Sequence, residues 1–133
     1  MRILRYIAAL ILVVISLIPI LSNAEVLPDV SGCTTASFVS GTDANVITIV
    51  GTTYSPKCLK LKVGATVTIL ASRHHPLMAM ADINGKQNPF ADGKLFDAAQ
   101  TRIMDRAGLF GYYCDNHGSA TGNGMAGAIL VEQ

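Results

Sequence analysis

The chain has 133 residues, of which 50% are hydrophobic and 14% are charged, and its formal net charge at pH 7 is +1. This composition excludes an intrinsically disordered chain and leaves room for one globular domain with a single core. With so few basic side chains, the sequence also excludes a nucleic-acid-binding footprint, so we expect no nucleic-acid partner.

Residues 1–24 have the composition of an export signal. Two arginines form a basic start, residues 7–21 are almost wholly apolar, and Ser22-Asn23-Ala24 places small residues where a signal peptidase cuts. A retained membrane anchor is the alternative, but the apolar run is shorter than the ~20 residues that span a bilayer. We therefore predict a cleaved signal peptide and a mature domain at 25–133, with a formal charge of −1 because both arginines leave with the signal. The protein would then be periplasmic or secreted, without stable membrane insertion.

After the predicted cleavage site, short β-type runs alternate with turn residues. Residues 25–40 mix proline, glycine and small polar side chains, which predicts a loosely ordered segment followed by an edge strand. Gly64-Ala65 is a tight-hairpin signal, and residues 82–100 predict a long crossover loop with a short helical turn at 95–99. Many short strands without a long helical period predict an all-β sandwich. The predicted strands are 46–50, 58–63, 66–71, 77–81, 101–104, 109–113 and 126–132.

Three cysteines are an odd number in a chain that we expect to be exported, so one must stay without a partner in the chain. Cys114 lies three residues before His117 in a glycine-rich segment, whereas Cys33 and Cys58 have no histidine nearby. We therefore predict a disulfide between Cys33 and Cys58 and leave Cys114 as a thiolate ligand. Two free buried thiols are the alternative. In the chain-entropy model, closing a loop of this length stabilises a fold by about 3 kcal/mol.

The histidines are also few, because His74, His75 and His117 are the only ones in the sequence. A thiolate, two imidazoles and a thioether form a soft donor set that suits copper, and a His₂Cys site with a weak axial methionine is the blue-copper arrangement. Met125 follows His117 after the glycine-rich stretch 118–124, which can loop back and bring its sulfur to the metal. The sequence therefore predicts a copper site.

Three stretches resemble the plastocyanin and azurin family, the cupredoxins. GLFGYYCDNHGSATGNGMAGAILVE at 108–132 is similar to the family's C-terminal hairpin, which flanks the copper before the last strand. YSPKCLKLKVGATVTI at 54–69 resembles the strand pair that leads to the upstream histidine ligand, and HHPLMAM at 74–80 supplies that ligand. The resemblance implies a Greek-key sandwich of two sheets with one copper ion bound at one end, between two loops.

By the same resemblance, the copper ligands would be His75, Cys114, His117 and Met125. His75 is favoured over His74 because it directly precedes the start of the next strand, and His74 would then face solvent. The sequence departs from the family in two ways. Pro76 has no N–H to donate to the cysteine sulfur, and the longer stretch between His117 and Met125 leaves axial ligation by Met125 open.

We interpret the protein as an exported type 1 (blue) copper protein and not as an enzyme. It would be a monomer that binds one copper ion per chain as Cu(I) or Cu(II) and carries single electrons between a redox donor and acceptor. The alternative is a periplasmic copper chaperone or storage protein, in which Met78 and Met80 form a second, soft copper site; core packing by these methionines is the simpler interpretation. We also expect an apolar docking patch made of Leu77, Met78 and Ala120.

Overall fold

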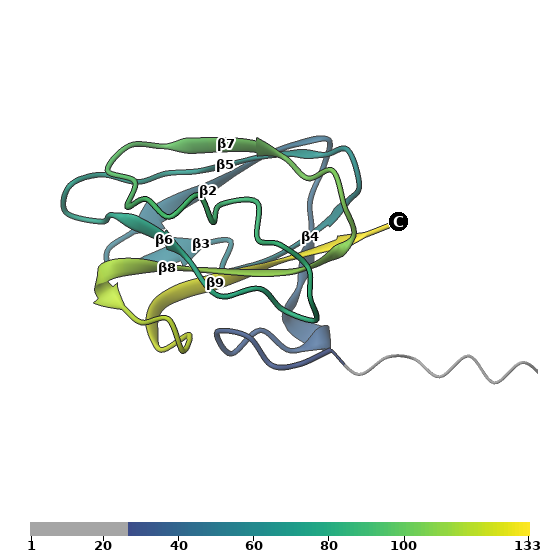
Figure 1. The fold of residues 1–133 in the computed structure, drawn as a ribbon, viewed down its shortest axis with the longest axis horizontal. Coiled ribbons are helices and arrows are strands. Elements are labelled where there is room, and N and C mark those ends of the chain that lie inside the picture. The colour runs from purple at the N-terminus through teal and green to yellow at the C-terminus, as the bar shows by residue number, and fades with distance from the viewer. Residues whose placement is uncertain (1–26) are drawn as a thin grey trace, which may run out of the picture.

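Two β-sheets face each other in the computed structural model, which describes residues 27–133 (Figure 1). One sheet has five strands in the order β1-β4-β9-β8-β6, and the other has four in the order β3-β2-β5-β7. The strands are β1 Val39–Ser40, β2 Ala44–Val50, β3 Thr53–Ser55, β4 Cys58–Lys62, β5 Thr66–Ile69, β6 Leu77–Ala79, β7 Gln100–Ile103, β8 Gly108–Gly118 and β9 Gly124–Glu132, and one 3₁₀ turn, η1, covers Thr35–Ser37. The predicted all-β, two-sheet sandwich is confirmed. The predicted signal peptide lies outside the described residues.

Every predicted strand is present, and β1 is the expected edge strand, paired in parallel with β4. The short strand β3 was not predicted, because three residues between two turns are too few to show alternation. The helical turn predicted at 95–99 is wrong. Phe96 instead exchanges two backbone hydrogen bonds with Leu77, at 2.8 and 3.1 Å, which extends the backbone at this point.

The predicted hairpin at Gly64-Ala65 is also wrong, although a tight turn is present. Ala65 N–H donates to the Lys62 carbonyl at 3.1 Å, and Gly64 has a φ of +93°. The strands on either side do not pair with each other, because β4 pairs with β9 in one sheet and β5 pairs with β2 and β7 in the other. The turn therefore carries the chain from one sheet to the other.

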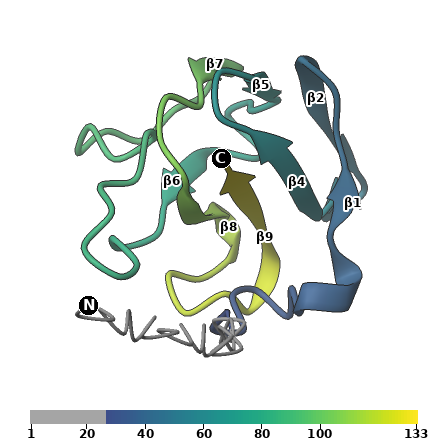
Figure 2. The same cartoon turned by 90° about the vertical axis from the view of Figure 1, so that its right-hand side faces the viewer.

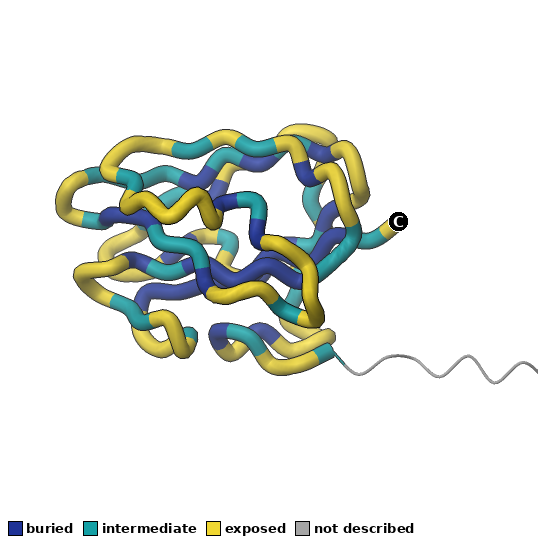
Figure 3. Tube along the Cα trace, in the orientation of Figure 1, coloured by how far each residue is buried: buried dark blue, intermediate teal, exposed yellow. Residues whose placement is uncertain are grey.

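The core lies between the sheets and follows the predicted alternation. Val67 and Ile69 on β5 are fully buried, whereas Thr66 and Thr68 face outward. Figure 3 shows the same pattern for the whole domain, with buried segments between the sheets and exposed segments at the turns. Full burial of each large aliphatic side chain contributes about 1.5–3 kcal/mol. This shared interior makes the two sheets one rigid frame.

The predicted disulfide between Cys33 and Cys58 is confirmed. It ties the segment before η1 to the first residue of β4, and both cysteines are buried. A second, smaller apolar cluster forms around them with Leu109, Ala128 and Leu130, on the face of the five-stranded sheet that points away from the main core. The N-terminal segment thus covers the outer face of that sheet.

The long loop between β6 and β7 is held down by Asn88, which is buried. Its Nδ2 donates to the carbonyls of Met80 and Gly111 at 3.2 and 2.8 Å, and its Oδ1 accepts from Phe90 N–H at 3.1 Å. One amide therefore bonds three backbone groups and links the loop to β8 at Gly111. Among the described residues, no helix has the length and apolar character needed to cross a bilayer.

Two buried tyrosines, Tyr54 and Tyr112, pack against each other in this core. The rings of Tyr54 and Tyr112 meet edge to face at 4.9 Å between centroids, and burial raises the pKa of both hydroxyls. Tyr112 donates to the Lys57 carbonyl at 3.4 Å, whereas the buried Tyr54 hydroxyl has no partner within residues 27–133.

We expect Tyr112→Phe to lower the free energy of unfolding by about 1 kcal/mol in denaturant titrations. Tyr54→Phe should cost less or even stabilise, because it removes an unpaired polar group. Equal losses in the two variants would contradict this.

Candidate metal centre

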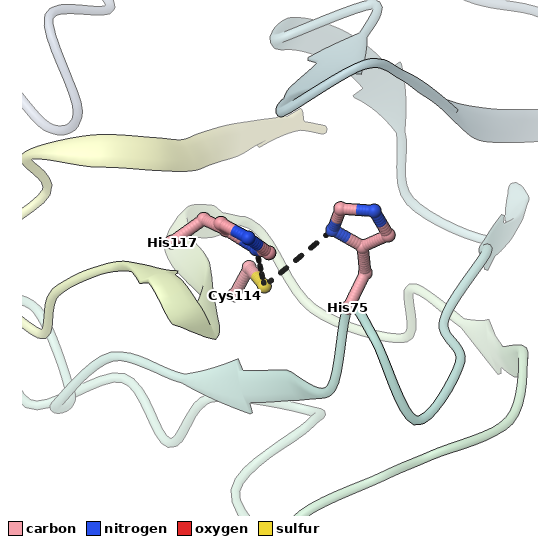
Figure 4. A group of neighbouring side chains, drawn as sticks. All are labelled: His75, Cys114 and His117. Atoms are coloured by element: carbon pink, nitrogen blue, oxygen red, sulfur yellow. Dashed lines mark hydrogen bonds between the residues drawn. The ribbon is translucent and has the colours of Figure 1, made fainter.

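The predicted ligands His75, Cys114 and His117 come together at one end of the sandwich. The loop before β6 carries His75, and the end of β8 carries the other two; both lie at the end opposite the C-terminus (Figure 1). Cys114 Sγ lies 3.6 Å from Nδ1 of His117 and 3.9 Å from Nδ1 of His75. The three ligand atoms lie within 4.8 Å of one another, and within residues 27–133 they form the only such group of histidine, cysteine or acidic side chains. Figure 4 shows both rings turned toward the sulfur.

His75 is placed by a tight turn at residues 72–75. Ser72 N–H donates to the His75 carbonyl at 3.1 Å, and His75 N–H donates to the Ser72 carbonyl at 3.0 Å and approaches its hydroxyl at 3.2 Å. The next residue, Pro76, leads directly into β6, which begins at Leu77. In this turn His75 is partly buried and faces the cysteine, whereas His74 is exposed and outside the group.

Cys114 and His117 converge because β8 leaves its regular pairing with β9. On a regular strand, side chains three residues apart point to opposite faces of the sheet. Pairing is regular up to Tyr113 and Ala126 and resumes between Gly118 and Gly124. Residues 114–117 therefore stand opposite Met125 alone. This excess of residues on β8 rotates the chain, so that a fully buried cysteine and an exposed histidine approach each other.

Met125 lies beside this segment on the neighbouring strand. It is 1% exposed and belongs to the same buried cluster as Cys114. A Cβ atom on Gly118 would collide with the Met125 carbonyl, so the backbones of the two strands come very close where the pairing resumes. Met125 thus lies on the strand beside the segment that carries Cys114 and His117.

Asn116, which was not predicted from the sequence as a site residue, ties the two ligand-bearing segments together. Its Nδ2 donates to the carbonyl of His74 at 3.1 Å and lies 3.4 Å from that of Arg73. Next to it, Asp115 N–H donates to the Pro76 carbonyl at 2.9 Å. The signal that would have drawn attention to Asn116 is its position between two predicted ligands, with an amide able to bond the backbone.

The cysteine sulfur accepts no backbone hydrogen bond in the described part of the chain. Within hydrogen-bonding distance of Cys114 Sγ are only the imidazole nitrogens of His75 and His117. Pro76, which follows His75, has no N–H to offer, and its carbonyl is used by Asp115. The environment of the sulfur is therefore poor in donors.

The predicted docking patch of Leu77, Met78 and Ala120 is wrong as stated. Leu77 is fully buried in the core, because its side chain points between the sheets where β6 pairs with β8 at Cys114. Met78 and Met80 also line different hollows, the first with Phe90 and the second with residues of the N-terminal segment. This separation does not favour one shared copper site for the two methionines.

Comparisons with known proteins find likeness in structure and not in sequence. No protein-family model matches the chain, and no curated protein is similar to it in sequence. Among solved structures, a pseudoazurin from a Sinorhizobium species is 22% identical with a TM-score of 0.52; the match covers 71% of this chain and 76% of that one. A pseudoazurin from Methylobacterium extorquens AM1 is 14% identical with a TM-score of 0.52, over 68% and 76% of the two chains.

A copper-containing nitrite reductase from Thermus scotoductus SA-01 is 19% identical with a TM-score of 0.53. The match covers 74% of this chain but only 28% of the reductase chain. Likeness at these levels of identity shows a shared fold.

Asn116 gives a direct test of how the site is held together. We expect Asn116→Ala to lower the unfolding free energy of the copper-free protein by about 0.5–1.5 kcal/mol, since the amide bonds link two separate segments. Asn123→Ala is the matched control, because that amide bonds only to Thr121 within its own loop. Denaturant titration of both variants measures the difference. If Asn123→Ala lowered the unfolding free energy as much as Asn116→Ala, the bonds between the two segments would stabilise the protein no more than a bond within one loop.

Proposed function

From the cupredoxin-like fold that these likenesses show, we propose that the chain is an exported type 1 (blue) copper protein that carries single electrons. His75, Cys114 and His117 would hold the metal, with Met125 as the weak axial ligand. The observation that carries the proposal is the convergence of one sulfur and two imidazole nitrogens within 4.8 Å. Such a donor set fits copper, and a neighbouring thioether is a poor ligand for zinc but a common axial ligand for copper.

When bound, copper supplies a one-electron couple between Cu(I) and Cu(II). The residues of this chain supply a fixed environment for it. Cys114 pairs with Leu77 of β6, just beyond the last regular pair of β8 with β9, and Asn116 links its segment to the turn that carries His75. Side chains positioned by a packed sandwich move little, which favours rapid electron exchange over rearrangement of ligands.

The burial of the ligands supports an electron carrier over a copper chaperone. Cys114 and Met125 are at most 1% exposed, and His75 is partly buried, whereas His117 is exposed. An imidazole edge at the surface gives electrons a short route to a partner, while the buried sulfur atoms are poorly placed to pass copper to another protein. Copper handling is therefore the alternative role, and the copper-binding spectrum distinguishes it from electron transfer.

The same proposal includes the surroundings in which the protein works. Export to the periplasm or the exterior is supported by the leader sequence and by the Cys33–Cys58 disulfide, which persists in oxidising compartments. The protein would act as a monomer between a redox donor and acceptor. Its fold is shared with part of a nitrite reductase, but the chain spans 28% of that enzyme, and we propose no catalytic role for it.

The first test is the visible absorption spectrum with one equivalent of Cu(II). We expect an intense thiolate-to-copper band in the wild type, loss of the band in Cys114→Ser, and loss or strong weakening in His75→Gln. His74→Gln is the matched control and should keep the band, because His74 lies outside the group. Tight binding of Cu(I) without the band would favour copper handling. Absence of any copper binding would contradict the proposal.

The second test concerns the potential of the site. Hydrogen bonds to the cysteine sulfur tune the redox potential of a blue-copper centre. Pro76 withholds one such donor, so we expect Pro76→Asn and Pro76→Ala, which both restore an N–H, to raise the midpoint potential in redox titrations. Pro89→Ala, away from the site, should leave it unchanged. An unchanged or lower potential in both Pro76 variants would refute this role of the proline.

A further inference from the structure

The loop at 118–124, which joins His117 to Met125, packs against the turn at 30–33. Figures 1 and 2 both show the segment after β8 beside the N-terminal segment, although the two are far apart in the sequence. The contact is close at Gly122. A Cβ atom there would lie 2.9 Å from both the backbone nitrogen and the Cα of Ser31, which is tighter than side chains tolerate.

The turn is itself fixed to the sandwich from two directions. Cys33, at its end, is joined to the first residue of β4 by the disulfide. Ser31 is 6% exposed, and its hydroxyl donates at 3.1 Å to the carbonyl of Gly127, two residues after Met125. Ser31 also has a φ of +59°, which a serine seldom adopts and which persists only where surrounding contacts impose it.

The loop, in contrast, has little other support. Ser119 N–H donates to the Asn123 carbonyl at 3.1 Å, and Gly122 N–H donates to the Ser119 carbonyl at 2.9 Å. The side-chain hydrogen bonds of Ser119, Thr121 and Asn123 also stay within the loop in the described part of the chain. The close approach of Gly122 to Ser31 is therefore the main contact between this loop and the body of the protein, and Ala120 and Thr121 line one hollow together with residues 29–31.

We propose that the disulfide-anchored turn 30–33 is a positioning element of the metal centre. It holds the 118–124 loop in place and so keeps His117 and Met125 at the spacing that copper needs. This inference rests on the proposed copper function and adds that the Cys33–Cys58 disulfide governs how slowly the metal is released. A chain in which this disulfide has not formed should retain copper less well, even if it folds.

The test compares two glycines that share a left-handed backbone. Gly122 has a φ of +86° and Gly93 a φ of +76°, so alanine meets similar backbone resistance at both, but a Cβ at Gly93 meets nothing within 4 Å. Two rates are measured: amide hydrogen exchange at 119–123 in the copper-free protein, and release of copper from the loaded protein to an excess of chelator. We expect Gly122→Ala to raise both rates by about tenfold, and Gly93→Ala to leave both nearly unchanged.

Two more variants separate the parts of the proposal. Ser31→Ala removes the hydrogen bond to Gly127, and the double variant Cys33→Ala/Cys58→Ala removes the anchor. Both should speed amide hydrogen exchange at 119–123 and copper release. If the double variant does not fold, Ser31→Ala alone tests whether the turn holds the loop. Unchanged exchange and release in both Gly122→Ala and Ser31→Ala would overturn the proposal. If the wild type binds no copper, the proposed function fails, yet the exchange rates still decide whether the turn holds the loop.

Discussion

The interruption of pairing between β8 and β9 is the constraint on which the rest of the site depends. Cys114 and His117 would point to opposite faces of a regular strand, and they meet because residues 114–117 stand opposite Met125 alone. Such an irregular segment needs support from its neighbours. It receives that support from the pairing of Cys114 with β6, from the backbone bond of Asp115 to Pro76 and from the amide of Asn116. The two regular sheets thus serve mainly to hold one irregular segment in a single conformation.

The parts of the fold that the sequence predicts are those encoded by neighbouring residues. Alternation of Val67 and Ile69 with threonines is enough to recognise β5 and its buried face. The sheet to which a strand belongs is not encoded locally. Gly64-Ala65 has the composition of a hairpin turn, but the parallel pairing of β4 with the distant strand β9 decides that the turn crosses between sheets. Phe96 is likewise kept out of a helix by its backbone bonds to Leu77.

In the candidate site, too, some residues are identified by their neighbours in the sequence, and others only by the fold. The spacing of Cys114 and His117 marks them directly, but His75 lies 39 residues upstream of the cysteine and was found through resemblance to a family. The amide of Asn116 could not be assigned a role, because its partners belong to another segment of the chain. Leu77 was misplaced on the surface for a related reason. Whether a strand residue faces solvent depends on which face of the sheet is covered, and only the fold shows this.

The last strand of the chain occupies an inner position in its sheet, between β4 and β8. The pairing of Cys58 with Ala128 therefore joins early and late parts of the polypeptide, and long-range contacts of this kind slow folding. During synthesis, the five-stranded sheet cannot close until β9 has emerged from the ribosome. If the chain is exported unfolded, as we propose, this order of events would suit its passage through the membrane. The place for the metal would then arise only after translocation is complete.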